Sequence, residues 1–187
     1  MEEMIRDGAF QGALDLCIGG VMEHLFEGNR DPGPDRLKAA AAAGIPTVLA
    51  PCGLDILSYG GRDDMLAKTR DRAQFVQDAL RVQVRTTADE LRAAADVIAE
   101  RLNAAQGEWT FLVPLQGWSS LDRPGRPMHD PAADAAFVER LEKRLTQPER
   151  VKKVDLQLYT PEFARVAVDE FARLYQAAHA PQTAGAA

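Results

Sequence analysis

The segment WTFLVPLQGWSSLDRPGRPMHDP, residues 109–131, decides the fold. It opens with an apolar run, and an unbroken apolar run of this length is typical of a strand in the interior of a parallel sheet. The glycines, prolines, hydroxyls and carboxylates that follow exceed what a plain connection of roughly two to six residues needs. We therefore expect a buried strand at 110–115, and we expect the loop after it to form one wall of a ligand cleft.

Further short strands alternate with helical patterns along the rest of the chain. Thr87 and Glu90 have the spacing of a capping box, and Pro131 and Pro161 suit the first positions of two later helices. This alternation predicts right-handed crossovers and a sheet covered on both faces. The expected strands are 13–17, 46–50, 80–84, 110–115 and 151–156, and the expected helices are 34–43, 87–103 and those beginning at 130 and 160.

The fold class that this pattern predicts is α/β, a Rossmann-like three-layer sandwich with a mostly parallel sheet of about five strands. The chain has 187 residues, of which 46% are hydrophobic, enough for one core of ordinary size. We expect a single domain over residues 1–178 and a flexible tail at 179–187. No internal repeat or Gly/Ser-rich linker divides the chain.

Composition narrows the classes of partner. The net charge of −6 argues against nucleic-acid or anionic-membrane partners, because both require a basic face. No apolar run reaches the roughly 18 residues of a membrane span. The acidic start, MEEMIRDGAF, lacks the order of a secretory signal, and two cysteines form no disulfide framework. We expect a reduced, cytoplasmic protein.

Polar, glycine-bearing loops follow four of the expected strands. Ligands of open parallel sheets bind beyond the carboxyl ends of the strands, where such loops converge and helix amino-termini add partial positive charge. We therefore expect these loops to share one mouth and to bind a small, polar or anionic molecule. The candidate ligand-binding residues are Gly19, Gly20, Gly53, Asp55, Arg85, Thr86, Gln116, Gly117, Ser119 and Ser120.

Simpler interpretations stay open for several of these residues. The Gly19-Gly20 pair is equally consistent with turns that need positive φ, and no phosphate-binding fingerprint is present. Cys17 and Cys52 both fall at strand ends, which brings them near each other, although an inert cysteine is favoured over a nucleophile. The histidine spacing predicts no metal site.

Two other classes of function remain as alternatives. Asp122, His129 and Cys52 are candidate catalytic residues of an enzyme that acts on a small carbonyl or carboxylate compound. The sequence lacks the G-x-S-x-G elbow of a serine hydrolase. A third possibility is an interaction module that uses Trp118 and residues 22–26 as a dimer surface.

Several motifs together resemble a known family. They include Gly-Pro-Asp-Arg-Leu (33–37), Gly-Ile-Pro (44–46), Leu-Asp (54–55), Arg-Thr-Thr (85–87), FLVPLQGWSSLD (111–122) and PGRPMHDPAAD (124–134). Over about residues 1–176 the chain resembles the carboxy-terminal half of the ATP-binding family that includes the tomato mosaic virus resistance protein. The resemblance implies two Rossmann-like lobes, dimers, and a nucleotide held with magnesium.

The chain also departs from that family. It has about half the family length, so we expect it to work with an amino-terminal lobe, a second subunit or another copy of itself. A glycine-rich segment that precedes the position of Met1 in the family is not present. Cys17-Ile18-Gly19-Gly20 stands where most members have a threonine-rich run ending in Glu, so any ligand or metal contact made by that run is changed here.

Overall fold

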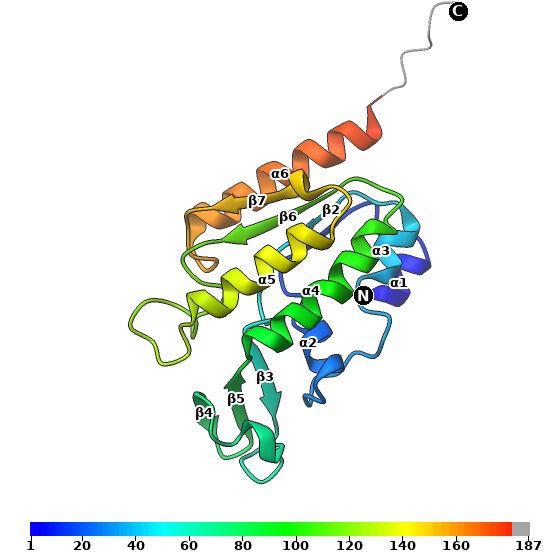
Figure 1. The fold of residues 1–187 in the computed structure, drawn as a ribbon. Helices are drawn as coiled ribbons and strands as arrows, with labels where there is room; N and C mark the ends of the chain where they lie inside the picture. Colours follow the sequence, from blue (N-terminus) through cyan, green and yellow to red (C-terminus); the bar gives the residue numbers. More distant parts are fainter. Residues whose placement is uncertain (181–187) are drawn as a thin grey trace, which may run out of the picture.

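Four parallel strands form the main sheet of the computed structural model, which describes residues 1–180. They are β1 (Ala13–Asp15), β2 (Thr47–Leu49), β6 (Trp109–Pro114) and β7 (Val151–Val154), in the spatial order β1-β2-β6-β7 (Figure 1). The predicted α/β class is confirmed. The sheet has four strands instead of about five.

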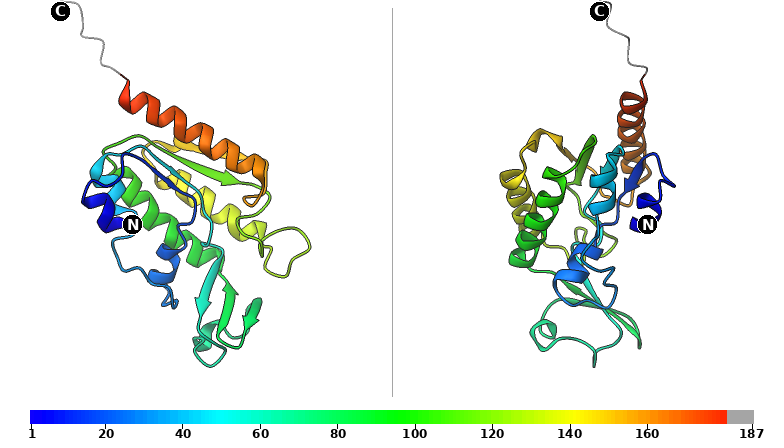
Figure 2. Two further views of the ribbon diagram at one scale, coloured as in Figure 1. Left: turned by 180° about the vertical axis from the view of Figure 1, so that it is seen from behind. Right: turned by 90° about the vertical axis from the view of Figure 1, so that its right-hand side faces the viewer.

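Helices cover both faces of this sheet (Figure 2). On one face lie α3 (Lys38–Ala43), α4 (Ala88–Asn103) and α5 (Pro131–Arg144), and on the other lies α6 (Pro161–His179). Alternation along β6 explains the arrangement, because successive side chains of a strand point to opposite faces. Phe111 packs with Phe137 of α5, whereas Leu112 packs with Phe163 of α6.

A second, antiparallel sheet accounts for the missing strand. It consists of β3 (Ile56–Tyr59), β5 (Arg81–Arg85) and β4 (Gln74–Asp78), in the order β3-β5-β4, and projects beyond the carboxyl end of β2 (Figure 1). The strand predicted at 80–84 exists, but its place in the main sheet was wrong. Val82 and Val84 are buried while Gln83 is only half-buried, and such alternation is typical of an antiparallel strand with one open face.

The remaining elements are short. They are α1 (Glu2–Arg6), α2 (Gly20–Leu25) and two 3-10 turns, Ala67–Thr69 and Pro148–Arg150. The helix predicted at 34–43 begins only at Lys38. Of the predicted tail, 181–187 lies outside the described residues, and His179 is the last residue of α6.

One hydrophobic cluster joins the two sheets. Leu57 of β3 and Val84 of β5 belong to the same cluster as Phe111 and Trp118, together with the inner face of α4. The small sheet is therefore fixed on the main body by shared core. Among residues 1–180, no helix combines the length and the apolar character needed to cross a membrane.

Candidate functional site

A cleft of about 240 Å³ lies where the loops after β1, β2 and β6 face the small sheet. Six of the eleven candidate ligand-binding or catalytic positions in these three loops meet there, contributed by segments far apart in the sequence. The residues that line the cleft are Cys17, Gly19, Gly20, Glu23, Arg30, Cys52, Gly53, Ile56, Ser58, Gln83, Ser119, Ser120, Leu121 and Tyr159.

Glycines allow the first two loops to touch. The amide of Gly19 donates a 3.1 Å hydrogen bond to the carbonyl oxygen of Cys52, and a Cβ at Gly19 would lie 2.6 Å from the oxygen of Gly53. Gly53 has φ of +84°, whereas Gly19 has φ of −53°. The requirement at Gly19 is thus close backbone approach, and the positive-φ interpretation of the Gly19-Gly20 pair is wrong, since neither glycine has positive φ.

Ser119 and Ser120, in the loop after β6, differ in whether their hydroxyls are free to bind a ligand. The Ser119 hydroxyl donates to Asp55 at 2.5 Å and accepts from the amides of Leu121 and Asp122, so its hydrogen-bonding capacity is used within the protein. Ser120 is exposed and makes no side-chain hydrogen bond to the described residues. Ser120 is therefore the hydroxyl that a ligand can reach.

Five polar side chains of the lining were not among the candidates, namely Glu23, Arg30, Ser58, Gln83 and Tyr159. Arg30 is exposed and forms no ion pair within residues 1–180, while Gln83 and Tyr159 present an amide and a phenol. Glu23 is buried and its carboxylate accepts from the amide of Ser58. Burial raises the pKa of Glu23, with Ser58 and Arg30 acting in the opposite direction. Of these residues, only Gln83 could have been predicted from the sequence, by the alternation of apolar and polar residues at 81–85.

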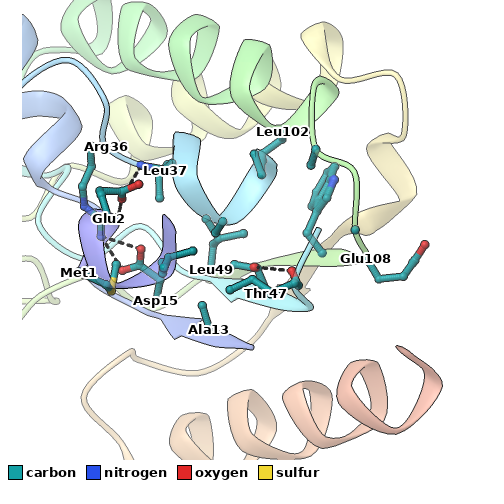
Figure 3. Close-up of a pocket in the computed structure, with 17 residues that line it drawn as sticks. Met1, Glu2, Ala13, Asp15, Arg36, Leu37, Thr47, Leu49, Leu102 and Glu108 are labelled. Carbon is teal, nitrogen blue, oxygen red and sulfur yellow. Dashed lines mark hydrogen bonds and ion pairs between the residues drawn. The ribbon is translucent and has the colours of Figure 1, made fainter. Parts of the chain in front are cut away.

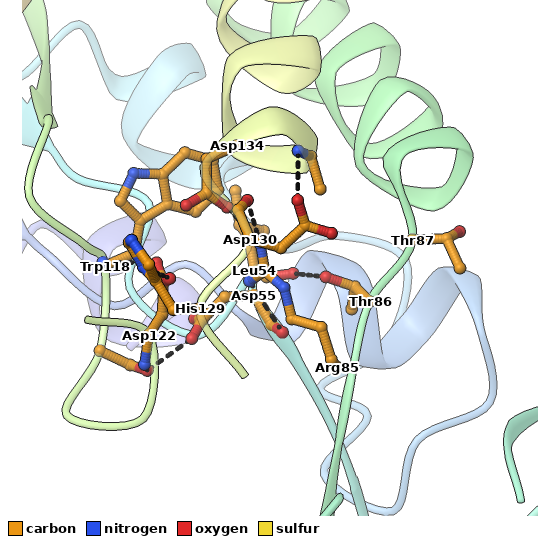
Figure 4. A network of polar contacts seen from close by, with 12 residues as sticks. Leu54, Asp55, Arg85, Thr86, Thr87, Trp118, Asp122, His129, Asp130 and Asp134 are labelled. Atoms are coloured by element: carbon orange, nitrogen blue, oxygen red, sulfur yellow. Dashed lines mark hydrogen bonds and ion pairs between the residues drawn. The ribbon is translucent and has the colours of Figure 1, made fainter. Parts of the chain in front are cut away.

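Through its hydrogen bond to Asp55, Ser119 connects the cleft wall to a buried polar network. Figure 4 shows Asp55, Arg85 and Asp134 of this network. In that network Arg85 donates to Asp134 at 2.5 Å and to the carbonyl oxygen of Asp55, and the hydroxyl of Thr86 donates to the carbonyl oxygen of Leu54 at 2.8 Å. Asp55, Arg85 and Thr86 were expected to bind ligand. They lie behind the cleft wall, at most 5% exposed, and hold the loops in place.

Three carboxyl groups share this network with a single arginine. Burial raises the pKa of Asp134 to about 8, with Asp122 adding to the rise and the Arg85 guanidinium opposing it. Burial also raises the pKa of Asp55. The short Arg85–Asp134 contact favours the ionised carboxyl, whereas the raised pKa favours the protonated one. One arginine cannot neutralise all three acids, so we assign the retained proton to the cluster as a whole.

Asp122 and His129 are paired but stand apart from the cleft. The Nδ1 atom of His129 lies 2.9 Å from Asp122, whose other oxygen accepts from the amide of Trp118 at 2.9 Å. Asp122 is fully buried, and neither residue lines the cleft. The hydroxyl of Ser119 bonds to Asp55 and not to His129, so no hydrolase triad is formed. The catalytic roles of Asp122, His129 and Cys52 stay predictions.

Other expected contributions are also absent from the lining. Gln116 bonds to Asp155 on the surface, and Gly117 allows the loop to pass Asp122. The starts of α4 and α5 are capped by Thr87 and by Asp130, and neither helix contributes to the cleft. The amino-termini of α4 and α5 therefore do not supply the positive charge that we expected there, whereas the short helix α2, which begins at Gly20, starts at the cleft.

Two residues of the dimer surface suggested by the sequence are buried in the core. Trp118 is 1% exposed and stacks edge-on against Phe137, and Met22 is completely buried. Both side chains belong to the core of the protein. These two side chains are therefore not accessible to a partner, whereas His24, Leu25 and Phe26 of the suggested surface are half-buried.

A second hollow, between α1, α3 and the first two strands, is too small for a ligand (Figure 3). It measures about 20 Å³, room for about one water molecule. Arg36 closes one side with ion pairs to Glu2 at 3.0 Å and to Asp15 at 2.6 Å. This hollow is a packing feature.

The cleft residues do not fit a magnesium nucleotide by themselves. Glu23 is the one carboxylate in the lining, and its oxygens already accept from the amide of Ser58. Magnesium is usually bound by one or two carboxylates together with substrate phosphates and water. Within residues 1–180, no three metal-ligating side chains form a cluster.

Comparison with known proteins gives one consistent result. Residues 1–175 match the model of the C-terminal domain of an uncharacterised protein family, UPF0261. A UPF0261 protein of Brucella melitensis is 29% identical over 172 residues, which cover 92% of this chain and 41% of the relative. A UPF0261 protein of Rhizobium meliloti is 31% identical, with coverages of 90% and 43%. The tomato mosaic virus resistance protein Tm-1 of Solanum lycopersicum is 31% identical, with coverages of 91% and 23%.

Proposed function

Because the chain belongs to the UPF0261 family and corresponds to its C-terminal domain, we propose that it is a ligand-binding α/β domain that works with a second domain or subunit. In this proposal the cleft at the carboxyl edge of the main sheet holds a small polar molecule. The observation that carries the proposal is the convergence of three strand-end loops and the small sheet on one concave, polar surface.

The cleft side chains that are not already engaged in hydrogen bonds or ion pairs within residues 1–180 indicate the chemistry of the ligand. Arg30 supplies an unpaired cation, which favours an anionic group such as a carboxylate or a phosphate. Gln83 and Ser120 supply both donors and acceptors of hydrogen bonds. Ile56 and Leu121 add apolar contact beside them.

The size of the cleft supports the need for a second wall. Ligand pockets usually enclose roughly 300–1,000 Å³, and this cleft offers about 240 Å³. The chain spans less than half the length of the Brucella and Rhizobium relatives. In the proposal, the additional part of such proteins covers the open side, and the pair of domains encloses the ligand.

Titration calorimetry tests the proposal directly. The chain is titrated with inorganic phosphate, small carboxylic acids, AMP and ATP, each with and without magnesium. The series is repeated with the amino-terminal part of a longer relative added in trans. We expect at least one anionic compound to bind, and to bind more tightly when the second part is present. Absence of binding in both series contradicts the proposal.

Matched variants locate the binding. Arg30→Ala should weaken the binding of an anionic ligand roughly ten- to a hundredfold, in line with about 1.5–3 kcal/mol for a charged hydrogen bond. Arg165→Ala, on the exposed face of α6, is the control. Ser120→Tyr should block the cleft, whereas Ala177→Tyr on α6 should not. Equal effects of test and control variants would place the ligand elsewhere.

A further inference from the structure

Cys17 and Cys52 face each other on the wall of the cleft, and nothing described above uses their chemistry. We propose that they form a reactive dithiol, in which a hydroperoxide oxidises Cys17 and Cys52 then closes a reversible disulfide. The proposal does not depend on which ligand the cleft binds.

Backbone pairing holds the two cysteines close. Residues Cys17 and Pro51 form an isolated bridge just beyond the parallel ladder of β1 and β2, and Cys52 follows Pro51 directly. The hydrogen bond from Gly19 to the carbonyl oxygen of Cys52 ties the second loop to the first. Both cysteines line the same cleft, and a Cβ placed on Gly53, the neighbour of Cys52, would lie 3.6 Å from the sulfur of Cys17. A disulfide requires neighbouring backbones of this kind.

The two thiols have different environments. Cys17 is exposed and Cys52 is half-buried, and neither is in a disulfide. The hydrogen bond from Cys52 lowers the pKa of Cys17 to about 6, whereas it raises the pKa of Cys52. A thiolate is the nucleophile in thiol oxidation, and exposure lets the oxidant reach it. Cys17 is thus the attacking residue and Cys52 the resolving one.

The charged groups around Cys17 do not change this assignment. Asp15 of β1 acts to raise the pKa of the thiol, and Arg36, which donates to the carbonyl oxygen of Cys17 at 3.2 Å, acts to lower it. Asp15 and Arg36 are themselves paired at 2.6 Å, so their effects largely offset each other. Tyr159, which also lines the cleft, acts to lower the pKa of Cys52.

The reaction balances with a hydroperoxide as the oxidant. The Cys17 thiolate attacks the outer oxygen, the O–O bond breaks, and the leaving alkoxide takes up a proton to become an alcohol. The thiol of Cys52 then displaces hydroxide from the sulfenic acid at Cys17, and its proton leaves with the hydroxide as water. Two electrons pass from the dithiol to the peroxide, and a thiol reductant reverses the change.

Mass spectrometry of the full chain tests the product, because these are the only two cysteines in the sequence. Stoichiometric peroxide should remove two hydrogen atoms from the monomer, and dithiothreitol should restore them. In Cys52→Ser the reaction should stop at a sulfenic acid on Cys17 that dimedone traps. In Cys17→Ser no disulfide within one chain is possible, and oxidation should be slow.

Alkylation kinetics of the unmodified protein test the assignment without any variant. At neutral pH, Cys17 should react with iodoacetamide roughly tenfold faster than Cys52, with a half-maximal rate near pH 6. Removing Cys52 should move that midpoint upward, because the hydrogen bond is lost. Equal rates for both thiols, a disulfide that joins two copies, or oxidation of Cys17 that never involves Cys52 would each overturn the proposal.

Discussion

Gly117 lies at the bend where the strand β6 turns into the cleft loop. Its φ is +120°, and a Cβ there would lie 1.8 Å from the carbonyl oxygen of Asp122. Gly125, farther along the loop, has φ of +81° but has no atom within 4 Å of an added Cβ. Gly117 therefore combines a steric collision with backbone strain, whereas Gly125 has backbone strain alone.

We expect Gly117→Ala to destabilise the protein by more than about 3 kcal/mol, because strain and collision combine, and Gly125→Ala by about 1 kcal/mol from strain alone. Urea unfolding of both variants beside the parent protein measures the difference. Similar losses for the two variants would show that the close approach at Gly117 is relieved by movement of the loop.

The buried acid cluster makes stability depend on pH. Asp134 has a folded-state pKa of about 8, above the value of an unfolded aspartate near 3.8. A group with a raised pKa contributes its full stabilisation below the unfolded pKa, and this contribution is lost as the pH rises through the folded pKa. The part of the unfolding free energy due to Asp134 should therefore fall between about pH 4 and pH 8.

Asp134→Asn removes the titrating group and should flatten the pH profile of stability over that window. The change should amount to a few kcal/mol, because one pKa unit corresponds to about 1.4 kcal/mol. Asp169→Asn, at an exposed position of α6, is the control and should leave the profile unchanged. Chemical denaturation at half-unit steps of pH decides the matter, and an unaltered slope in Asp134→Asn would show that Asp134 does not hold the retained proton of the cluster.

At the scale of the element, α4 has the best-defined start. The amide of Glu90 donates to the Thr87 hydroxyl at 3.2 Å, and the Glu90 carboxylate accepts from the amide of Thr87 at 2.9 Å. Glu90 also pairs with Arg72 at 2.7 Å, which fixes the loop before β4. The cap therefore joins the long helix to the small sheet.

Thr87→Ala should lower the free energy of unfolding by about 1 kcal/mol, because one amide of the first turn loses its acceptor. Thr87→Ser keeps a hydroxyl at the cap and should recover most of the loss. Thermal unfolding followed by circular dichroism compares the two variants. Equal stability of the Ala and Ser variants would mean that Glu90 alone maintains the start of α4.

The sequence predicted elements well where local chemistry determines them. The boundaries of α4, α5 and α6 follow from a capping threonine or aspartate and from prolines at the first turn, and all three helices begin within one residue of the prediction. The strands β3 and β4 were missed, because their partner β5 alone had a visible alternation. Pairing between strands depends on distant residues, which a local pattern does not contain.

The same distinction applies to the cleft. Gly19, Cys52 and Ser119 were found because they follow strands of the main sheet, where the topology brings loops together. Arg30 and Gln83 reach the cleft only through the placement of the small sheet and of the segment after α2. Arg85 was assigned to the surface of the cleft although it lies behind it, because sequence does not show how deeply a charged side chain is buried.

For the whole molecule, the shared core predicts one cooperative unit. Leu57 of the small sheet is fully buried and packs in the same cluster as Phe111 and Trp118 of the main body. Leu57→Ala should therefore cost roughly 2–5 kcal/mol. Leu80→Ala, at a position that is 76% exposed, should cost less than about 0.5 kcal/mol.

Tryptophan fluorescence reports on the main body, because Trp109 and Trp118 both lie there, whereas far-ultraviolet circular dichroism reports on the whole chain. Within each variant, the two signals should give the same unfolding midpoint. Separate transitions for the two signals would show instead that the small sheet unfolds independently. They would also divide the single domain that we predicted for residues 1–178.

The strands of the main sheet are laid down in chain order from one edge to the other, as β1-β2-β6-β7. Open α/β sheets commonly form their crevice where the winding reverses direction, and this sheet has no such reversal. Its hollow exists because the chain leaves the layer after β2 and builds a separate three-stranded wall before α4. A homologue could exchange that wall for another and acquire a new specificity, while the underlying scaffold kept its winding.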